Sequence, residues 1–253
     1  MVRLIEFVNV SKSFGSKKVL DELSFSIARG KITFVVGKSG EGKSVTIKNI
    51  IGLLHPDSGQ IVFENQIVTK FTHDEMRKHR RRFGMLFQNA ALFDSMTVEE
   101  NIMFPLQEYS NLKGSEIRKR VQEVMHDVAL APDLLSKYPN ELSTGERKRV
   151  GLGRALIAKP DIVLYDEPTT SMDPLVSEMI DHLIVKINET DERITSIVIS
   201  HDLKAALATA DTIIMLYKGK VALCGSPDEF KSTQDPIVRQ FFAGKIEGPM
   251  EFV

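Results

Sequence analysis

The stretch that decides the fold is Gly37-Lys38-Ser39-Gly40-Glu41-Gly42-Lys43-Ser44. It fits the pattern G-x-x-x-x-G-K-[ST] of a phosphate-binding P-loop. A strand-like run over 31–36 precedes it, and a helix-like run over 45–51 follows it. This strand–loop–helix order is the context in which such a loop binds phosphate, so it separates the motif from a chance match.

The residue types of the loop explain its chemistry. Gly37, Gly40 and Gly42 let the backbone adopt positive φ, so that successive N–H groups can form a nest for anionic oxygens. The helix that begins here adds free N–H groups and the positive end of its dipole. Lys43 adds a full charge near the outer phosphates, and the Ser44 hydroxyl is placed to ligate Mg²⁺.

Size and composition predict one large cytosolic domain, or a domain with an inserted subdomain. The chain has 253 residues, of which 42% are hydrophobic and 26% charged, and its net charge of −1 does not suggest nucleic acid as a partner. No apolar run approaches the ~18–20 residues that cross a bilayer, and residues 1–6 lack a signal-peptide core. Cys224, the only cysteine, excludes an internal disulfide and a multi-cysteine zinc site.

The patterning predicts an α/β fold with a helical insertion. Residues 4–35 alternate as antiparallel strands, whereas 97–158 have helical spacing punctuated by proline and glycine. Strands that alternate with helices elsewhere indicate a parallel sheet with right-handed crossovers. We expect further strands at 60–64, 83–87, 162–165, 194–199 and 212–216, and helices at 97–107, 114–129, 145–159, 175–188 and 202–208.

One run of basic residues, Arg77-Lys-His-Arg-Arg-Arg82, allows two interpretations. It could contact acidic lipid headgroups, or it could be the solvated face of a helix and turn. The second is favoured, because most charge runs are solvated faces. The residues before the strand at 60–64, over 54–59, are expected to form a loop.

Polar residues follow the predicted parallel strands, where ligands of such sheets bind. Gln88, Asp166 with Glu167, and His201 each come directly after a strand, as the P-loop does. Asp166 is expected to hold Mg²⁺ and Glu167 to accept a proton from an attacking water. Adjacent carboxylates beside a phosphate site would repel each other without a cation, which again implies Mg²⁺.

Three further residues have weaker signals. Gln88 can orient water or complete the Mg²⁺ shell, and a mostly neutral His201 can donate to the terminal phosphate. Phe14, in a turn-like Phe-Gly-Ser, can stack on a base. Each also has a structural interpretation, as a solvated strand end, a structural hydrogen-bonding group or a core aromatic.

A second anion site is predicted at Leu142-Ser-Thr-Gly-Glu146. Ser143 and Glu146 have the spacing of a capping box at a helix start, and such a start exposes free N–H groups. It lies in the helical insertion, apart from the P-loop in the sequence. Two half-sites in one chain suggest a head-to-tail dimer, in which the P-loop of one copy and Ser143 of the other close on one ATP.

These motifs together resemble the nucleotide-binding subunit of an ABC transporter over nearly the whole chain. Phe14 matches the aromatic A-loop residue, Gly37–Ser44 Walker A, Gln88 the Q-loop, Leu142–Glu146 the LSGGQ signature, Ile162–Asp166 Walker B, Glu167 the catalytic glutamate, Thr170–Asp173 the D-loop and His201 the switch histidine. The signature departs at Thr144 and Glu146. Thr144 adds a side chain at the dimer face, and Glu146 adds negative charge near the γ-phosphate unless it folds back on the cap.

The resemblance implies a full set of site residues and cofactors, ATP and Mg²⁺. Catalysis is assigned to Glu167, His201, Gln88 and Lys43, and Mg²⁺ ligation to Ser44, Gln88 and Asp166. Nucleotide binding is assigned to Phe14, Gly37, Lys38, Ser39, Gly40, Glu41, Gly42, Lys43, Ser44 and Val45. Ser143, Thr144, Gly145 and Glu146 act in trans, with Asp173 in the D-loop. The fold expected is α/β, a P-loop NTPase (RecA-like) with a mixed-sheet core, an antiparallel N-terminal β-subdomain and an inserted α-helical subdomain.

The expected division of the chain follows from these motifs. Residues 1–93 and 160–225 form the ATP-binding core of a single ABC ATPase domain, 94–159 the helical subdomain, and 226–253 a C-terminal helical tail.

Two stretches, Met85–Asp94 and Asp235–Phe241 with Gly248-Pro249, are similar to the ATPase of Mla/Mce-type phospholipid transporters. This similarity implies a homodimer of ATPase subunits, integral membrane permease subunits, an Mce-domain lipid-binding protein and a small STAS-domain subunit, with no nucleic acid. It implies a peripheral location at the cytoplasmic face of the inner membrane. Residues 244–253 would contact the neighbouring ATPase copy.

Other classes remain as alternatives. An amino-acid or metal importer ATPase and a soluble ABC ATPase of iron–sulfur assembly share these motifs. A DNA-repair ABC ATPase would need a long coiled-coil or zinc insertion that this chain lacks. A P-loop kinase would leave Leu142–Glu146 unexplained.

Overall fold

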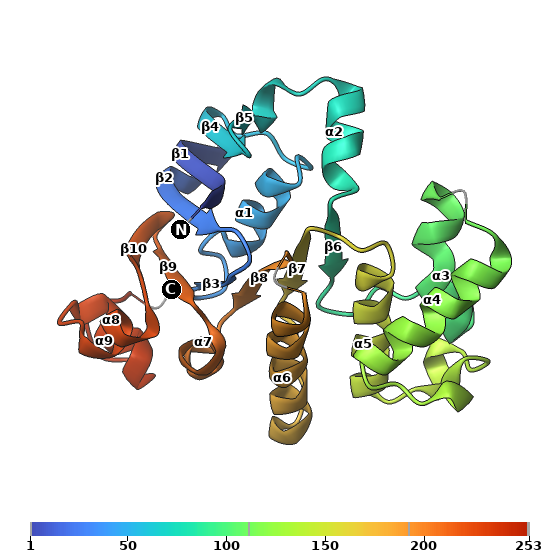
Figure 1. The fold of residues 1–253 in the computed structure, drawn as a ribbon. Coiled ribbons are helices and arrows are strands. Elements are labelled where there is room, and N and C mark those ends of the chain that lie inside the picture. Colours follow the sequence, from blue (N-terminus) through green and yellow to red (C-terminus); the bar gives the residue numbers. More distant parts are fainter. Residues whose placement is uncertain (1, 111, 192, 252–253) are drawn as a thin grey trace. The chain divides into compact units, whose positions relative to one another are not determined.

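The computed structural model describes residues 2–110, 112–191 and 193–251. The chain divides into two compact units, Met1–Arg80 with Ile197–Val253, and Arg81–Ser196, and Figure 1 shows their elements. The predicted helical subdomain, 94–159, lies within the second unit, which also includes 81–93 and 160–196 of the predicted core. The subdomain boundaries given above stay a prediction.

The first unit combines an antiparallel sheet with parallel strands. The antiparallel sheet has the order β2-β1-β4-β5, β3 pairs in parallel with β9, and β10 pairs antiparallel with β9. Its elements are β1 (Arg3–Phe14), β2 (Lys17–Ala28), β3 (Ile32–Val36), α1 (Lys43–Ile50), β4 (Ser58–Phe63), β5 (Gln66–Ile67), α2 (His73–Arg80), α7 (Leu203–Thr209), β9 (Thr212–Tyr217), β10 (Lys220–Gly225), α8 (Pro227–Ser232) and α9 (Pro236–Ala243).

The burial pattern of these strands explains how they pack. Leu23, Phe25 and Ile27 of β2 are buried while the residues between them are not, as expected for a sheet with one covered face. Every residue of β3 is buried, which is the pattern of a parallel strand covered on both faces. β4 begins at Ser58, so the expected loop over 54–59 is wrong at its end.

The basic run of α2 is only partly a solvated face. His79 is 4% exposed, and its Nε2 lies 2.8 Å from the carbonyl oxygen of Ile50, at the C-terminal end of α1. Arg80 donates to the carbonyls of Ile51 and Gly52 at 3.1 and 2.6 Å. Since a helix end leaves its last carbonyls without intrahelical partners, these two residues complete the end of α1.

The second unit is a helical cluster joined to a strand pair. β6 pairs in parallel with β7, with Phe83 opposite Ile162, and helices α3, α4 and α5 contact one another. Its elements are β6 (Phe83–Leu86), α3 (Val98–Tyr109), α4 (Gly114–Asp127), α5 (Thr144–Leu156), β7 (Ile162–Asp166) and α6 (Pro174–Thr190), and β8 (Thr195–Ser200) runs from this unit into the first. The expected helices and strands are therefore present, with ends shifted by a few residues.

The C-terminal segment is fastened to its own chain. The Gln240 amide donates to the carbonyls of Lys245, Ile246 and Met250, and its oxygen accepts from the Met250 N–H at 2.6 Å. Contact of residues 244–253 with a second copy stays a prediction, and residues 252–253 lie outside the described part. In the described residues, no helix combines the length and apolarity needed to span a bilayer.

We expect His79→Ala to lower the free energy of unfolding by about 2–3 kcal/mol, because it leaves a buried carbonyl and a cavity at the end of α1. Urea titration followed by circular dichroism measures the change. His55→Ala is the control, since that side chain is exposed. Equal stability of the two variants would contradict this account of the α1 end.

Candidate functional site

The P-loop has the backbone that its glycines predict. Gly37, Gly40 and Gly42 have φ of 152°, 85° and 95°. A Cβ at Gly37 would lie 2.6 Å from the carbonyl oxygen of Leu216, and one at Gly42 would lie 2.6 Å from a Leu20 methyl carbon. Both positions therefore require glycine for space as well as for conformation.

Lys43 spans the loop that it follows. Its side chain is buried, at 6% exposure, and its Nζ donates to the carbonyls of Gly37 and Lys38 at 2.7 and 2.9 Å. Ser44, next to it at the start of α1, is exposed. The ammonium and the hydroxyl are thus presented at the helix N-terminus, where the free N–H groups also favour an anion.

The rim of the P-loop is held by the end of the chain. Lys38 Nζ donates to the carbonyl of Glu251 at 2.5 Å, and the Glu251 carboxylate pairs with Lys218 at 2.9 Å. The Glu41 carboxylate accepts from the Lys218 N–H. No sequence pattern indicated these contacts, because those of Lys38 and Glu41 join residues 213 and 177 positions apart.

Phe14 and His201 belong to the same unit as the P-loop. Phe14 ends β1 with 48% of its surface exposed, so a large aromatic face is available for stacking. His201 is exposed directly after β8. Both positions agree with the predicted roles, which stay predictions.

The carboxylates of the second unit lie at the end of β7. Asp166 and Glu167 are half-buried, and Glu167 has φ of +48°. The Thr170 hydroxyl donates to Glu167 Oε2 at 3.0 Å, and the Thr170 N–H donates to the Glu167 carbonyl at 3.4 Å. Glu167 is therefore held in a left-handed turn that fixes the direction of its side chain.

The signature forms the predicted capping box, and this decides where the Glu146 carboxylate goes. Glu146 Oε2 accepts from the Ser143 N–H at 2.8 Å and from the Ser143 hydroxyl at 2.6 Å. These hydrogen bonds hold the pKa of Glu146 below its usual range. The carboxylate folds back on the cap, and in doing so it accepts the hydrogen bond of the signature serine hydroxyl.

The neighbours of this cap are also engaged. The exposed Thr144 hydroxyl accepts a hydrogen bond from Arg147 at 3.1 Å. Gly145 is buried, and a Cβ at this position would lie 2.8 Å from the Val176 side chain. Asp173 caps α6 by accepting from the Val176 N–H at 3.0 Å. The signature glycine and the D-loop aspartate thus meet at the first turn of α6.

A cavity of about 280 Å³ joins three of the motif segments of the second unit. Its lining includes Gln88, Thr144 and Thr170, together with Lys148. The structure therefore brings Gln88 and the signature to one hollow beside the segment that follows Glu167.

Lys148 is the residue that the sequence analysis missed. It is 3% exposed, and burial lowers its pKa to about 8 while Asp166 and Glu167 act to raise it. A signal was present, since Lys148 is three and four residues from Gly145, Gly151 and Leu152 on α5, and so shares their buried face. Because Arg147 and Arg149 flank Lys148, the three residues together have the sequence pattern of a solvated charge run.

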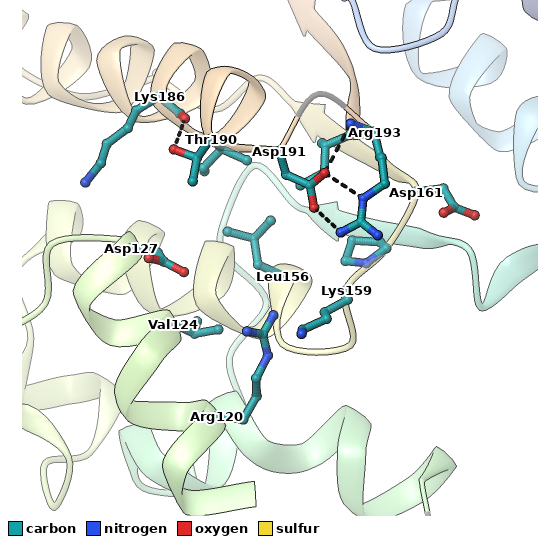
Figure 2. A pocket seen from close by; sticks show the side chains of 13 residues that line it. Arg120, Val124, Asp127, Leu156, Lys159, Asp161, Lys186, Thr190, Asp191 and Arg193 are labelled. Carbon is teal, nitrogen blue, oxygen red and sulfur yellow. Dashed lines mark hydrogen bonds and ion pairs between the residues drawn. The ribbon is translucent and has the colours of Figure 1, made fainter. Parts of the chain in front are cut away.

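A second pocket, of about 300 Å³, lies elsewhere in this unit and contains none of the predicted site residues. Figure 2 shows its wall of charged side chains, with Arg193 paired to both oxygens of Asp191. Arg82 pairs with a further lining residue, Asp161, at 2.5 Å. Because Arg193 and Asp161 are paired within the protein and no motif residue lines the pocket, it does not resemble the anion site that the motifs require.

The donor set expected for Mg²⁺ suits that ion. Ser44, Gln88 and Asp166 offer hydroxyl, amide and carboxylate oxygens, the hard ligands that Mg²⁺ takes, with phosphate oxygens completing such sites. Ser44 belongs to the first unit and the other two to the second. Their ligation of one ion stays a prediction.

Comparisons with known proteins agree with these motifs. Residues 20–170 match the family model described as ABC transporter. The chain is 37% identical over 246 residues, 97% of its length and 68% of the relative's, to "Probable ribonucleotide transport ATP-binding protein mkl" of Mycobacterium tuberculosis. It is 36% identical over 249 residues, 98% of its length and 94% of the relative's, to "Intermembrane phospholipid transport system ATP-binding protein MlaF" of Haemophilus influenzae.

A solved structure of an ATP-binding cassette is also similar to this chain. A dimer of the ATP-binding cassette MJ0796 bound to ADP and Pi is similar with a TM-score of 0.80 and 31% identity, over 88% of this chain and 99% of that one.

Glu146→Gln removes a charge from the signature and loosens its hold on the Ser143 proton. Since charge-assisted hydrogen bonds are about twice as strong as neutral ones, we expect the KM for ATP to fall up to about tenfold. Steady-state ATP hydrolysis measures this. Glu229→Gln is the control, because Ser226 and Glu229 form the same capping box at α8. If both variants keep the parental KM, Glu146 does not restrain the signature.

Proposed function

The chain belongs to the ABC transporter family, and we propose that it is the ATP-hydrolysing subunit of a membrane complex that moves phospholipid between membranes. Its activity is ATP hydrolysis by a dimeric cassette. The observation that carries the proposal is the P-loop, where positive φ at Gly37, Gly40 and Gly42 and the buried Lys43 make a cradle for phosphate.

Hydrolysis in this cassette relies on positioning and charge neutralisation, since phosphoryl transfer needs little covalent help. Lys43 and the loop N–H groups bind the outer phosphates. The Glu167 carboxylate, oriented by Thr170, accepts the proton of the attacking water. His201 donates to the terminal phosphate, and Gln88 orients the water. When bound at Ser44, Gln88 and Asp166, Mg²⁺ supplies charge neutralisation on the phosphate oxygens.

A second copy completes each site in this proposal. The N-terminus of α5, with Ser143 at the N-cap, is a good anion site because its first N–H groups lack intrahelical partners. The MJ0796 cassette is a dimer with ADP and Pi, which supports a shared site. Ser143, Thr144, Gly145 and Glu146 of one copy would face the phosphates held by the other.

Phospholipid is the proposed cargo because the relative named for phospholipid transport aligns over 94% of its own length. A second cargo has one observation in its favour, since the mycobacterial relative is named for ribonucleotide transport. The proposed partners are a permease in the membrane, an Mce-domain lipid-binding protein and a STAS-domain small subunit. The chain would then lie peripherally on the cytoplasmic face of the inner membrane.

Glu167→Gln tests the hydrolytic role. We expect the rate of ATP hydrolysis to fall at least about 100-fold, because the amide cannot take the proton of water, while ATP affinity stays within about twofold. Phosphate release and binding of a fluorescent ATP analogue measure the two quantities. Glu178→Gln, an exposed position on α6, is the matched control. Near-parental turnover in Glu167→Gln would remove Glu167 from the catalytic role.

The cargo is tested with the complex purified from its own membranes through a tag on this chain and reconstituted in vesicles. We expect ATP-dependent exchange of fluorescent phospholipid between donor and acceptor vesicles, and no exchange with the Glu167→Gln chain. ATP-dependent uptake of labelled ribonucleotide without lipid exchange would favour the second cargo. Purification with soluble partners alone would contradict both.

A further inference from the structure

Lys148 is a buried cation to which none of the ATPase motifs assigns a role. Its side chain is 3% exposed on α5. Its ammonium donates a hydrogen bond to a backbone carbonyl, and the nearby carboxylates of Asp166 and Glu167 offset only part of the cost of burial. Burying an ammonium costs stability, so a role other than core packing would explain why a lysine occupies this position.

The hydrogen bond made by Lys148 indicates what this role is. Its Nζ donates to the backbone carbonyl of Glu167 at 3.4 Å, and the Thr170 N–H donates to the same oxygen at 3.4 Å. Glu167 has φ of +48°, a conformation that costs a residue with a side chain of order 1–3 kcal/mol and persists only where its surroundings impose it. Lys148 and Thr170 both contribute to that restraint.

The charge of Lys148 also interacts with the carboxylates at the end of β7. The carboxylates of Asp166 and Glu167 both interact favourably with its ammonium, although burial is the larger influence on the lysine. The 280 Å³ cavity beside Lys148, which Gln88 also lines, lies next to this arrangement.

We propose that Lys148 is a positioning residue, which clamps the Glu167 carbonyl and so holds the Glu167 carboxylate in the direction that hydrolysis requires. The proposal rests on the function above, in which Glu167 takes the proton from water. Lys148 acts through its contact with Glu167.

Lys148→Met tests the proposal, because methionine keeps the length of the side chain but neither donates nor carries charge. In the full-length ATPase, we expect kcat to fall about tenfold while the KM for ATP and nucleotide affinity change less than about twofold. We expect the melting temperature to stay the same or rise, since a buried charge is removed. If Lys148 had only a structural role, Lys148→Met would lower the melting temperature and would not lower kcat separately from KM.

Lys119→Met is the matched control, as the same change on the exposed face of α4. It should leave kcat, KM and melting temperature as they are in the parent. Parental kcat in Lys148→Met would overturn the proposal, and so would a parallel loss of kcat, ATP affinity and melting temperature.

Hydrogen exchange gives a readout that does not depend on ATP turnover. The Thr170 N–H donates to the carbonyl that Lys148 clamps, so Lys148→Met should speed exchange of the peptide over 167–173 about tenfold, with α5 and α6 unchanged. Unchanged exchange there would overturn the positioning role even if activity fell. If the parental chain hydrolyses no ATP, the proposed function fails, while this measurement still decides whether Lys148 restrains Glu167.

Discussion

Two functional segments of this chain, the P-loop and the turn after β7, depend on one constraint, a backbone turned through positive φ soon after a buried strand. After β3 the turn is made by glycines, which adopt such angles without strain. After β7 it is made by Glu167, which has a side chain and therefore needs external restraint. The difference is chemical. The P-loop must bring its backbone close to a ligand, whereas the Glu167 turn must deliver a side chain.

Helix caps serve the same segments in a second way. Ser143 caps α5, Asp173 caps α6 and Asp202 caps α7, each with a side-chain oxygen that accepts backbone N–H groups. These caps fix the first turn of each helix at the points where the motifs lie. At Ser143 the cap competes with function, because the hydroxyl that would face a phosphate is held by the Glu146 carboxylate.

Buried charge at the site follows the same logic. Lys43 is buried and donates to two carbonyls of its own loop. Lys148 is buried and makes a long contact with the Glu167 carbonyl. The two loop contacts of Lys43 lie within eight consecutive residues, while the contact of Lys148 needs α5 and the turn after β7 to meet.

The sequence by itself determined the order of strands and helices, the P-loop conformation and the capping box, because each follows from residues a few positions apart. For that reason the predicted helices begin within two residues of the observed starts, and the strand face of Leu23, Phe25 and Ile27 in β2 is buried as the alternation predicts. Only the tertiary structure decided which polar side chains are buried. His79 completes the end of α1, Gln240 fastens the C-terminal segment, and Lys148 meets Glu167. Periodicity shows that such residues share a face with core positions, but it does not show what packs against that face.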